Sequence, residues 1–213
     1  MSMTILESSL QKPPIPQQLD PIERYVPLGL KLGIYAILIL FLYQAAATFA
    51  AYKPGVPWPR LLNIVRTFIF LPLHEGGHFL FMFFGSTLMI LGGSFWQIMF
   101  PLLSFLIAMK KRSEVAPFAL FWTGENMMDV SLYIRDAAVC QLPLLGGDKS
   151  RHDWYNLLSG WGALDSAETL GDLTYYSGII VCVGSIATGI FLAFLFYLRP
   201  RQPVANWKAD SEN

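Results

Sequence analysis

The stretch FLPLHEGGHFLFMFFG, residues 70–85, places two histidines and a glutamate inside an otherwise apolar run. His74 lies about 20 Å along a helix expected to start near Leu61. That position is close to the middle of a hydrocarbon core about 30 Å thick. An ionisable side chain there costs at least about 2.5–3.5 kcal/mol on insertion scales. The stretch therefore indicates a membrane helix whose polar residues have a partner or a function.

Composition supports a membrane protein. The chain has 213 residues, of which 54% are hydrophobic and 14% charged, whereas a soluble domain carries about a quarter charged residues. We expect one transmembrane domain over residues 26–200, after a flexible leader (1–25) and before a C-terminal tail (201–213). The formal net charge of zero gives no reason to expect a nucleic-acid partner. Cys140 and Cys182 show no disulfide or CxxC pattern.

The apolar runs predict an all-α, polytopic membrane protein of about five transmembrane helices, because about 20 helical residues cross a bilayer. The predicted spans are Val26–Ala51, Leu61–Gly85, Leu88–Met109, Val115–Asp136 and Leu173–Leu198. The fourth carries several polar residues and is expected to turn one face into protein. Between the fourth and fifth spans we expect a re-entrant or interfacial segment, with tryptophans as interfacial anchors.

The distribution of lysine and arginine predicts the orientation. With five spans, Lys53, Arg60 and the basic run at residues 110–112 fall on one side, together with the basic residues of the C-terminal tail. The segment at residues 137–172 falls on the other side and is richer in acidic residues. We therefore expect the N-terminus outside and the C-terminus in the cytoplasm.

HEGGH, residues 74–78, matches the pattern H-E-x-x-H. Residues four apart share one helix face, so His74 and His78 can direct imidazole nitrogens at one point. This geometry suits two ligands of a tetrahedral Zn²⁺ ion. Glu75 is then placed to act as the general base that takes a proton from a metal-bound water. Gly76 and Gly77 favour equally a close approach by substrate and plain helix packing.

The third zinc ligand is left open by the sequence. His152 is the only histidine outside the motif, and histidine is a common zinc ligand. Asp136 is the alternative on the fourth predicted helix, where it shares a polar stripe with Asp129 and Tyr133. Asp129 and Asp148 are further carboxylate candidates. For Gln97 we predict an interhelical hydrogen bond rather than a contact with substrate.

These residues resemble the site-2-protease class of intramembrane zinc metalloproteases, in a divergent bacterial type. The resemblance is carried by His74, Glu75 and His78 and covers the second predicted helix and its neighbours. It implies a zinc-dependent endopeptidase that cleaves transmembrane protein or peptide substrates, in the lipid of the bacterial inner membrane. The family takes its third ligand from an Asn-x-x-Pro…Asp-Gly segment. Here the nearest counterpart is QLPLLGGDKSRHDW, residues 141–154. Either Asp148 is a displaced counterpart of the family's aspartate, or that aspartate is replaced by His152 or by Asp136, which precedes the segment.

Two other functions compete with the peptidase. A non-catalytic membrane scaffold or binding protein would retain zinc for structure, although a structural site needs four closed ligands and no base. A small ion carrier would use Glu125, Asp129 and Asp136 as a relay. The sequence shows neither a visible repeat nor the paired broken helices that carriers often have, which counts against a carrier. The sequence predicts no oligomeric state.

Overall fold

A computed structural model of the chain describes residues 28–51, 59–142 and 152–198, which form helices and turns without strands. In chain order the helices are α2 (Leu28–Ala50), α3 (Arg60–Val65), η2 (Arg66–Phe70), α4 (Leu71–Phe81), η3 (Met82–Phe84), α5 (Ser86–Lys110), α6 (Ala116–Asp136), α7 (Asp153–Gly160), η5 (Leu164–Ser166) and α8 (Ala167–Leu198). Segment η2 is a π-helical turn, and η3 and η5 are short 3-10 turns. The predicted leader and C-terminal tail lie outside the described residues.

The protein is an all-α membrane protein, as the sequence predicts. Within the described residues, four helical stretches are long and apolar enough to cross a membrane. They are Leu28–Ala50, Arg60–Phe84, Ser86–Lys110 and Leu164–Leu195. The predicted spans agree with these helices to within a few residues at most ends, because each helix contains a long, predominantly apolar run.

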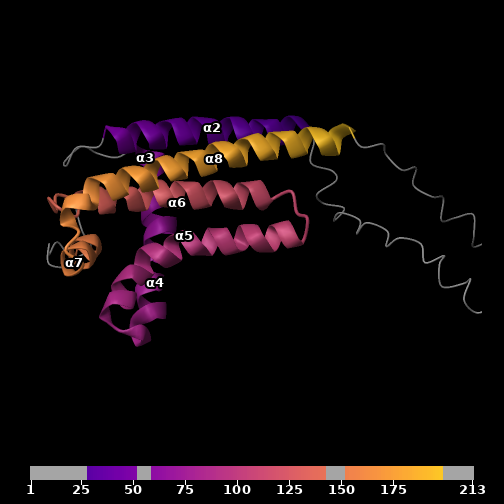
Figure 1. Ribbon diagram of the computed structural model, residues 1–213. Helices are drawn as coiled ribbons and strands as arrows, with labels where there is room; N and C mark the ends of the chain where they lie inside the picture. The colour runs from indigo at the N-terminus through magenta and orange to yellow at the C-terminus, as the bar shows by residue number, and fades with distance from the viewer. Residues whose placement is uncertain (1–27, 52–58, 143–151, 199–213) are drawn as a thin grey trace, which may run out of the picture.

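Helix α6 is the fourth predicted span and is less apolar than the other four. It is helical from Ala116 to Asp136, and it lies between α5 and α8 (Figure 1). Its polar side chains, including Asn126 and Asp129, are buried within the protein. A helix enclosed by other helices does not need the apolar surface of one that faces lipid. The predicted polar face of this helix is therefore turned into protein.

Helix α8 begins earlier than the sequence predicts, at Ala167 instead of Leu173. Its first turns are polar, and they are held against α6. Asp172 forms an ion pair with Arg135 of α6. Gly171 approaches α6 so closely that a Cβ there would lie 3.0 Å from the carbonyl oxygen of Ser131. Contact with α6 therefore extends the helix beyond its apolar run.

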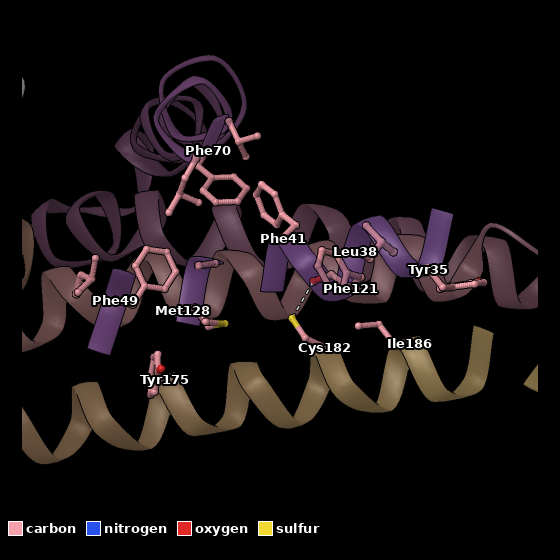
Figure 2. Packing of buried hydrophobic residues seen from close by; sticks show 14 of the residues in the cluster. Tyr35, Leu38, Phe41, Phe49, Phe70, Phe121, Met128, Tyr175, Cys182 and Ile186 are labelled. Atoms are coloured by element: carbon pink, nitrogen blue, oxygen red, sulfur yellow. Dashed lines mark hydrogen bonds between the residues drawn. The ribbon is translucent and has the colours of Figure 1, made fainter. Parts of the chain in front are cut away.

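The core lies where α2, α6 and α8 meet. Figure 2 shows Phe41, Phe121 and Cys182 in this cluster of buried residues. The thiol of Cys182 donates a hydrogen bond to the carbonyl of Phe121 (3.4 Å). Phe70 of η2 joins the cluster from the side. Cys140 and Cys182 are both free thiols, in keeping with the absence of a disulfide pattern.

The α3–η2–α4 segment positions the HEGGH motif. In Figure 1 it runs across the direction of α2, α5, α6 and α8, and α4 packs on α5. Helix α7 lies in the predicted interfacial region, at the end of the bundle where α6 ends and α8 begins (Figure 1). Its Trp154 Nε1 donates a hydrogen bond to Ser94 Oγ of α5 (3.0 Å). Helix α7 is thus docked on α5, the helix against which the motif-bearing α4 packs.

Candidate metal centre

Three potential ligands converge from two elements. His74 and His78 lie one turn apart on α4, and Asp153 is the first residue of α7. The Nε2 atom of His74 lies 2.9 Å from Asp153 Oδ2, and that of His78 lies 3.2 Å from the same oxygen. One ligand atom from each residue lies within 4.8 Å of the others. This is the one group of three or more such side chains within the described residues that can hold a metal ion.

The other ring nitrogens are already engaged with hydrogen-bond acceptors. His74 Nδ1 lies 3.1 Å from Gln97 Oε1, and His78 Nδ1 lies 2.8 Å from the carbonyl oxygen of Met89. Because a carbonyl oxygen can only accept, each Nδ1 must donate a hydrogen. In the neutral imidazole each Nε2 then presents a lone pair. Two lone pairs directed at one carboxylate oxygen need a positive charge between them, from protons or from a metal ion.

The distances between the ligand atoms and the free space in front of them both fit a zinc ion. A tetrahedral zinc ion with bonds of about 2.0–2.1 Å holds its ligand atoms about 3.4 Å apart, close to the two distances to Asp153. Gly93 of α5 faces the same nitrogens. A Cβ at Gly93 would lie 2.6 Å from His78 Nε2 and 2.8 Å from His74 Nε2. The missing side chain therefore keeps open the space in front of both Nε2 atoms.

Asp153 is held in its ionised form. Burial acts to raise the pKa of its carboxyl, but the hydrogen bonds and positive charge that protonated His74 and His78 supply outweigh burial and lower the pKa to about 2. The side chains of all three residues are partly exposed, at 17%, 23% and 24% for His74, His78 and Asp153. The group is thus a partly accessible cluster of polar side chains rather than a sealed part of the core.

Glu75 is exposed and follows His74 directly on α4. It precedes His78 by three residues, so the two side chains occupy neighbouring positions on the helix surface. This is the position that the motif requires of a general base beside two ligands. The geometry thus leaves Glu75 free of the ligand group and next to it.

Two predicted candidates for the third ligand lie outside this group. His152 and Asp136 contact each other instead. His152 Nε2 lies 3.1 Å from Asp136 Oδ2, and both side chains are buried. His152 Nδ1 accepts a hydrogen bond from the backbone N–H of Tyr155 (3.2 Å), so both of its ring nitrogens are engaged. Asp148 lies outside the described residues.

Asp129, the remaining carboxylate candidate, belongs to a buried polar chain behind His74. Arg66 Nε donates to Asp129 Oδ1 (2.5 Å), and Gln97 Nε2 donates to Asp129 Oδ2 (2.9 Å). Arg66 also donates to the hydroxyl of Tyr133 (3.1 Å), whose ring stacks on His74. Gln97 thus makes the predicted interhelical hydrogen bonds, from α5 to both α4 and α6.

The two glycines of the motif have different surroundings. A Cβ at Gly77 would lie 2.2 Å from the carbonyl oxygen of Gly92, so Gly77 lets α4 and α5 come into backbone contact. A Cβ at Gly76 would meet nothing within 4 Å. Helix packing therefore accounts for Gly77, and the structure gives no account of Gly76.

Sequence reasoning missed Asp153 as a member of this group of potential ligands. The signal was present in the adjacent pair His152-Asp153, where a histidine before a short amphipathic helix can act as its N-cap. His152 caps α7 with Nδ1 and contacts Asp136 of α6 with Nε2, while the next residue, Asp153, contacts the histidines of α4. The neighbours Gly93 and Met89 were also missed, because a glycine or a backbone carbonyl on another helix carries no metal-binding pattern.

No protein-family model matches the chain, and no curated protein or solved structure matches it. The functional argument therefore depends on the geometry described above.

Proposed function

We propose that this protein is a zinc-dependent intramembrane endopeptidase in which His74, His78 and Asp153 hold Zn²⁺ and Glu75 is the general base. One observation carries the proposal. The Nε2 atoms of both histidines meet one oxygen of Asp153, while their Nδ1 atoms are engaged with acceptors. A bound cation resolves the repulsion that neutral imidazoles would otherwise meet at that oxygen. The H-E-x-x-H pattern favours zinc over protons as that cation.

In the proposed mechanism the metal ion and Glu75 have separate roles in hydrolysis. When bound, zinc supplies Lewis acidity, which acidifies a water molecule and polarises a peptide carbonyl. Glu75 would accept the proton of that water and pass it to the leaving amine. Three protein ligands leave a fourth position for water, as in catalytic zinc sites.

The competing functions are less well supported. A structural zinc site uses four protein ligands, whereas the described residues supply three, beside an exposed carboxylate. An ion carrier would need the α6 acids as a relay. Asp129 is bound by Arg66 and Gln97, and Asp136 is bound by His152 and two backbone N–H groups. These two acids therefore serve as fixed structural acceptors in the described fold.

Transmembrane proteins or peptides are the substrates that the surroundings favour. Large apolar side chains on α4 and η3 are exposed close to the motif, among them Phe79, Phe83 and Phe84. Such a surface suits contact with lipid or with an apolar substrate helix. The proposed setting is the bacterial inner membrane, with the N-terminus outside and the C-terminus in the cytoplasm. This orientation follows from the distribution of lysine and arginine.

The proposal is tested with Glu75→Gln and a matched control, Glu168→Gln, which changes another exposed glutamate in α8. Zinc-loaded proteins in liposomes are given a panel of single-span peptides, and cleavage is followed by mass spectrometry. We expect Glu75→Gln to keep its zinc and lose cleavage by about 10²–10⁴-fold, while Glu168→Gln cleaves like the wild type. Failure of zinc-loaded wild type to cleave any peptide, or undiminished cleavage by Glu75→Gln, would overturn the proposal.

A further inference from the structure

Gln97 makes two hydrogen bonds in which it plays opposite roles. Its amide nitrogen donates to Asp129 Oδ2 (2.9 Å), and its amide oxygen lies 3.1 Å from His74 Nδ1. Gln97 is 2% exposed and Asp129 is 4% exposed. In this buried setting the side chains must satisfy one another, because an unmatched donor or acceptor is costly.

The direction of these bonds is fixed from one end. Arg66 can only donate, and it does so to Asp129 Oδ1. The ionised Asp129 can only accept, so it must face the NH₂ group of Gln97 and not its oxygen. The oxygen of Gln97 is then turned to His74, where it can only accept. When the imidazole of His74 is neutral, its proton is thereby held on Nδ1 and its lone pair on Nε2.

We infer that Asp129, acting through Gln97, is a positioning residue that sets the tautomer of His74 and so presents Nε2 to the metal. This inference rests on the proposed function for the use of that lone pair. The chain of residues Arg66, Asp129 and Gln97 is called the polar chain below. Groups that bind the second ring nitrogen of a metal-ligating histidine commonly fix its tautomer and orientation.

The π-helical turn explains how Arg66 joins this chain. Arg66 precedes His74 by eight residues, which in an uninterrupted α-helix would rotate it about 80° away from the face of His74. The backbone N–H of Leu71 instead bonds to the carbonyl of Arg66, five residues before it. The wider π turn reduces the rotation per residue, and it returns Arg66 toward the side of the helix that faces α6.

Asp129→Asn tests the inference because it should reverse the donor and acceptor roles in the hydrogen bonds of the polar chain. Because Arg66 can only donate, the new amide at position 129 would turn its oxygen to Arg66 and its NH₂ group toward Gln97. Gln97 would then turn its oxygen to that amide and its own NH₂ group to His74. The proton of His74 would move to Nε2, where it blocks the metal. Adding Gln97→Glu should restore the original direction, since a carboxylate accepts both from the amide at position 129 and from His74.

The measurements are zinc affinity by competition with a chelator and the protonation of His74 by NMR. The full-length chain has only three histidines, so its ¹⁵N-histidine spectrum in detergent micelles is simple. We expect Asp129→Asn to weaken zinc binding about 10–100-fold and, in zinc-free protein with neutral imidazoles, to move the His74 proton from Nδ1 to Nε2. The double variant Asp129→Asn/Gln97→Glu should return both properties to near wild type. The control Glu125→Gln, another buried carboxyl-to-amide change on α6, should alter neither.

The outcomes separate this inference from the proposed function. Weaker zinc binding by Asp129→Asn with an unmoved proton, or no recovery in the double variant, would mean that Asp129 acts only structurally and would overturn the inference. Unchanged affinity in Asp129→Asn would also overturn it. If the wild type binds no zinc, the proposed function is overturned, and so is the part of the inference that gives Nε2 of His74 to a metal.

Discussion

His152 Nε2 lies 3.1 Å from Asp136 Oδ2, and this buried pair joins the last residue of α6 to the residue before α7. His152 also caps α7 by accepting the N–H of Tyr155. Asp136 in turn accepts the backbone N–H groups of Gln141 and Leu142. The pair therefore fixes the start of α7, where Asp153 faces the two histidines of the motif.

His152→Ala should weaken zinc binding without removing a ligand. Loss of the pair leaves the carboxylate of Asp136 without its histidine and frees the start of α7. We expect zinc affinity to fall about 10–100-fold, as for other residues that orient ligands, with saturation still at about one zinc per chain. Stability should fall by about 1–3 kcal/mol, because the hydrogen bond to the carboxylate of Asp136 and the N-cap of α7 are both lost.

Zinc titration and unfolding in mixed micelles check this prediction. His152→Asn is the control for the capping role, because asparagine is a good N-cap residue but is shorter than histidine. It should recover part of the stability. A His152→Ala protein that takes up no zinc at saturation would instead make His152 a ligand.

Gly93→Ala should abolish zinc binding by filling the space in front of the histidines. The added methyl group would lie 2.6 Å from His78 Nε2 and 2.8 Å from His74 Nε2. Gly76→Ala is the matched control on α4, because its methyl group would meet nothing within 4 Å. Alanine at position 76 should keep zinc and stabilise the helix by up to about 1 kcal/mol. Full zinc content in Gly93→Ala would show that the ion does not bind at these two nitrogens.

Gly124→Ala should destabilise the contact between α6 and α8. A Cβ there would lie 2.6 Å from the carbonyl oxygen of Gly178 and 2.5 Å from the sulfur of Cys182. Overpacking of this kind costs about 1–3 kcal/mol, measurable as unfolding at lower denaturant in mixed micelles. Gly184→Ala, at an open position on α8, should have a much smaller effect. Equal stability of the two variants would mean that the helices are not in backbone contact at Gly124.

The fold was largely predictable because lipid selects for long apolar runs. The helices from Leu28, Ser86 and Ala116 follow directly from such runs and from the polar residues between them. The first turns of α8 were not predictable, because they are polar and depend on contacts with α6. The pair Arg135–Asp172 is one such contact between residues distant in sequence.

The candidate site was predictable only in part. His74 and His78 belong to one local pattern, so their convergence follows from the helical repeat. Asp153 comes from a distant short helix, and its direction depends on how the neighbouring His152 docks against Asp136. The sequence drew attention to His152 because histidine is the commoner ligand. The structure engages that histidine on both nitrogens and brings the adjacent carboxylate to the motif.

The zinc content of the purified protein tests the central claim most directly. Wild type is compared with Asp153→Asn and with Asp165→Asn, a control at an exposed aspartate on η5. We predict about one zinc per chain in the wild type and in Asp165→Asn, and loss of that zinc in Asp153→Asn. A wild type without zinc, or an Asp153→Asn protein that keeps it while Asp136→Ala or Asp148→Ala loses it, would contradict the account.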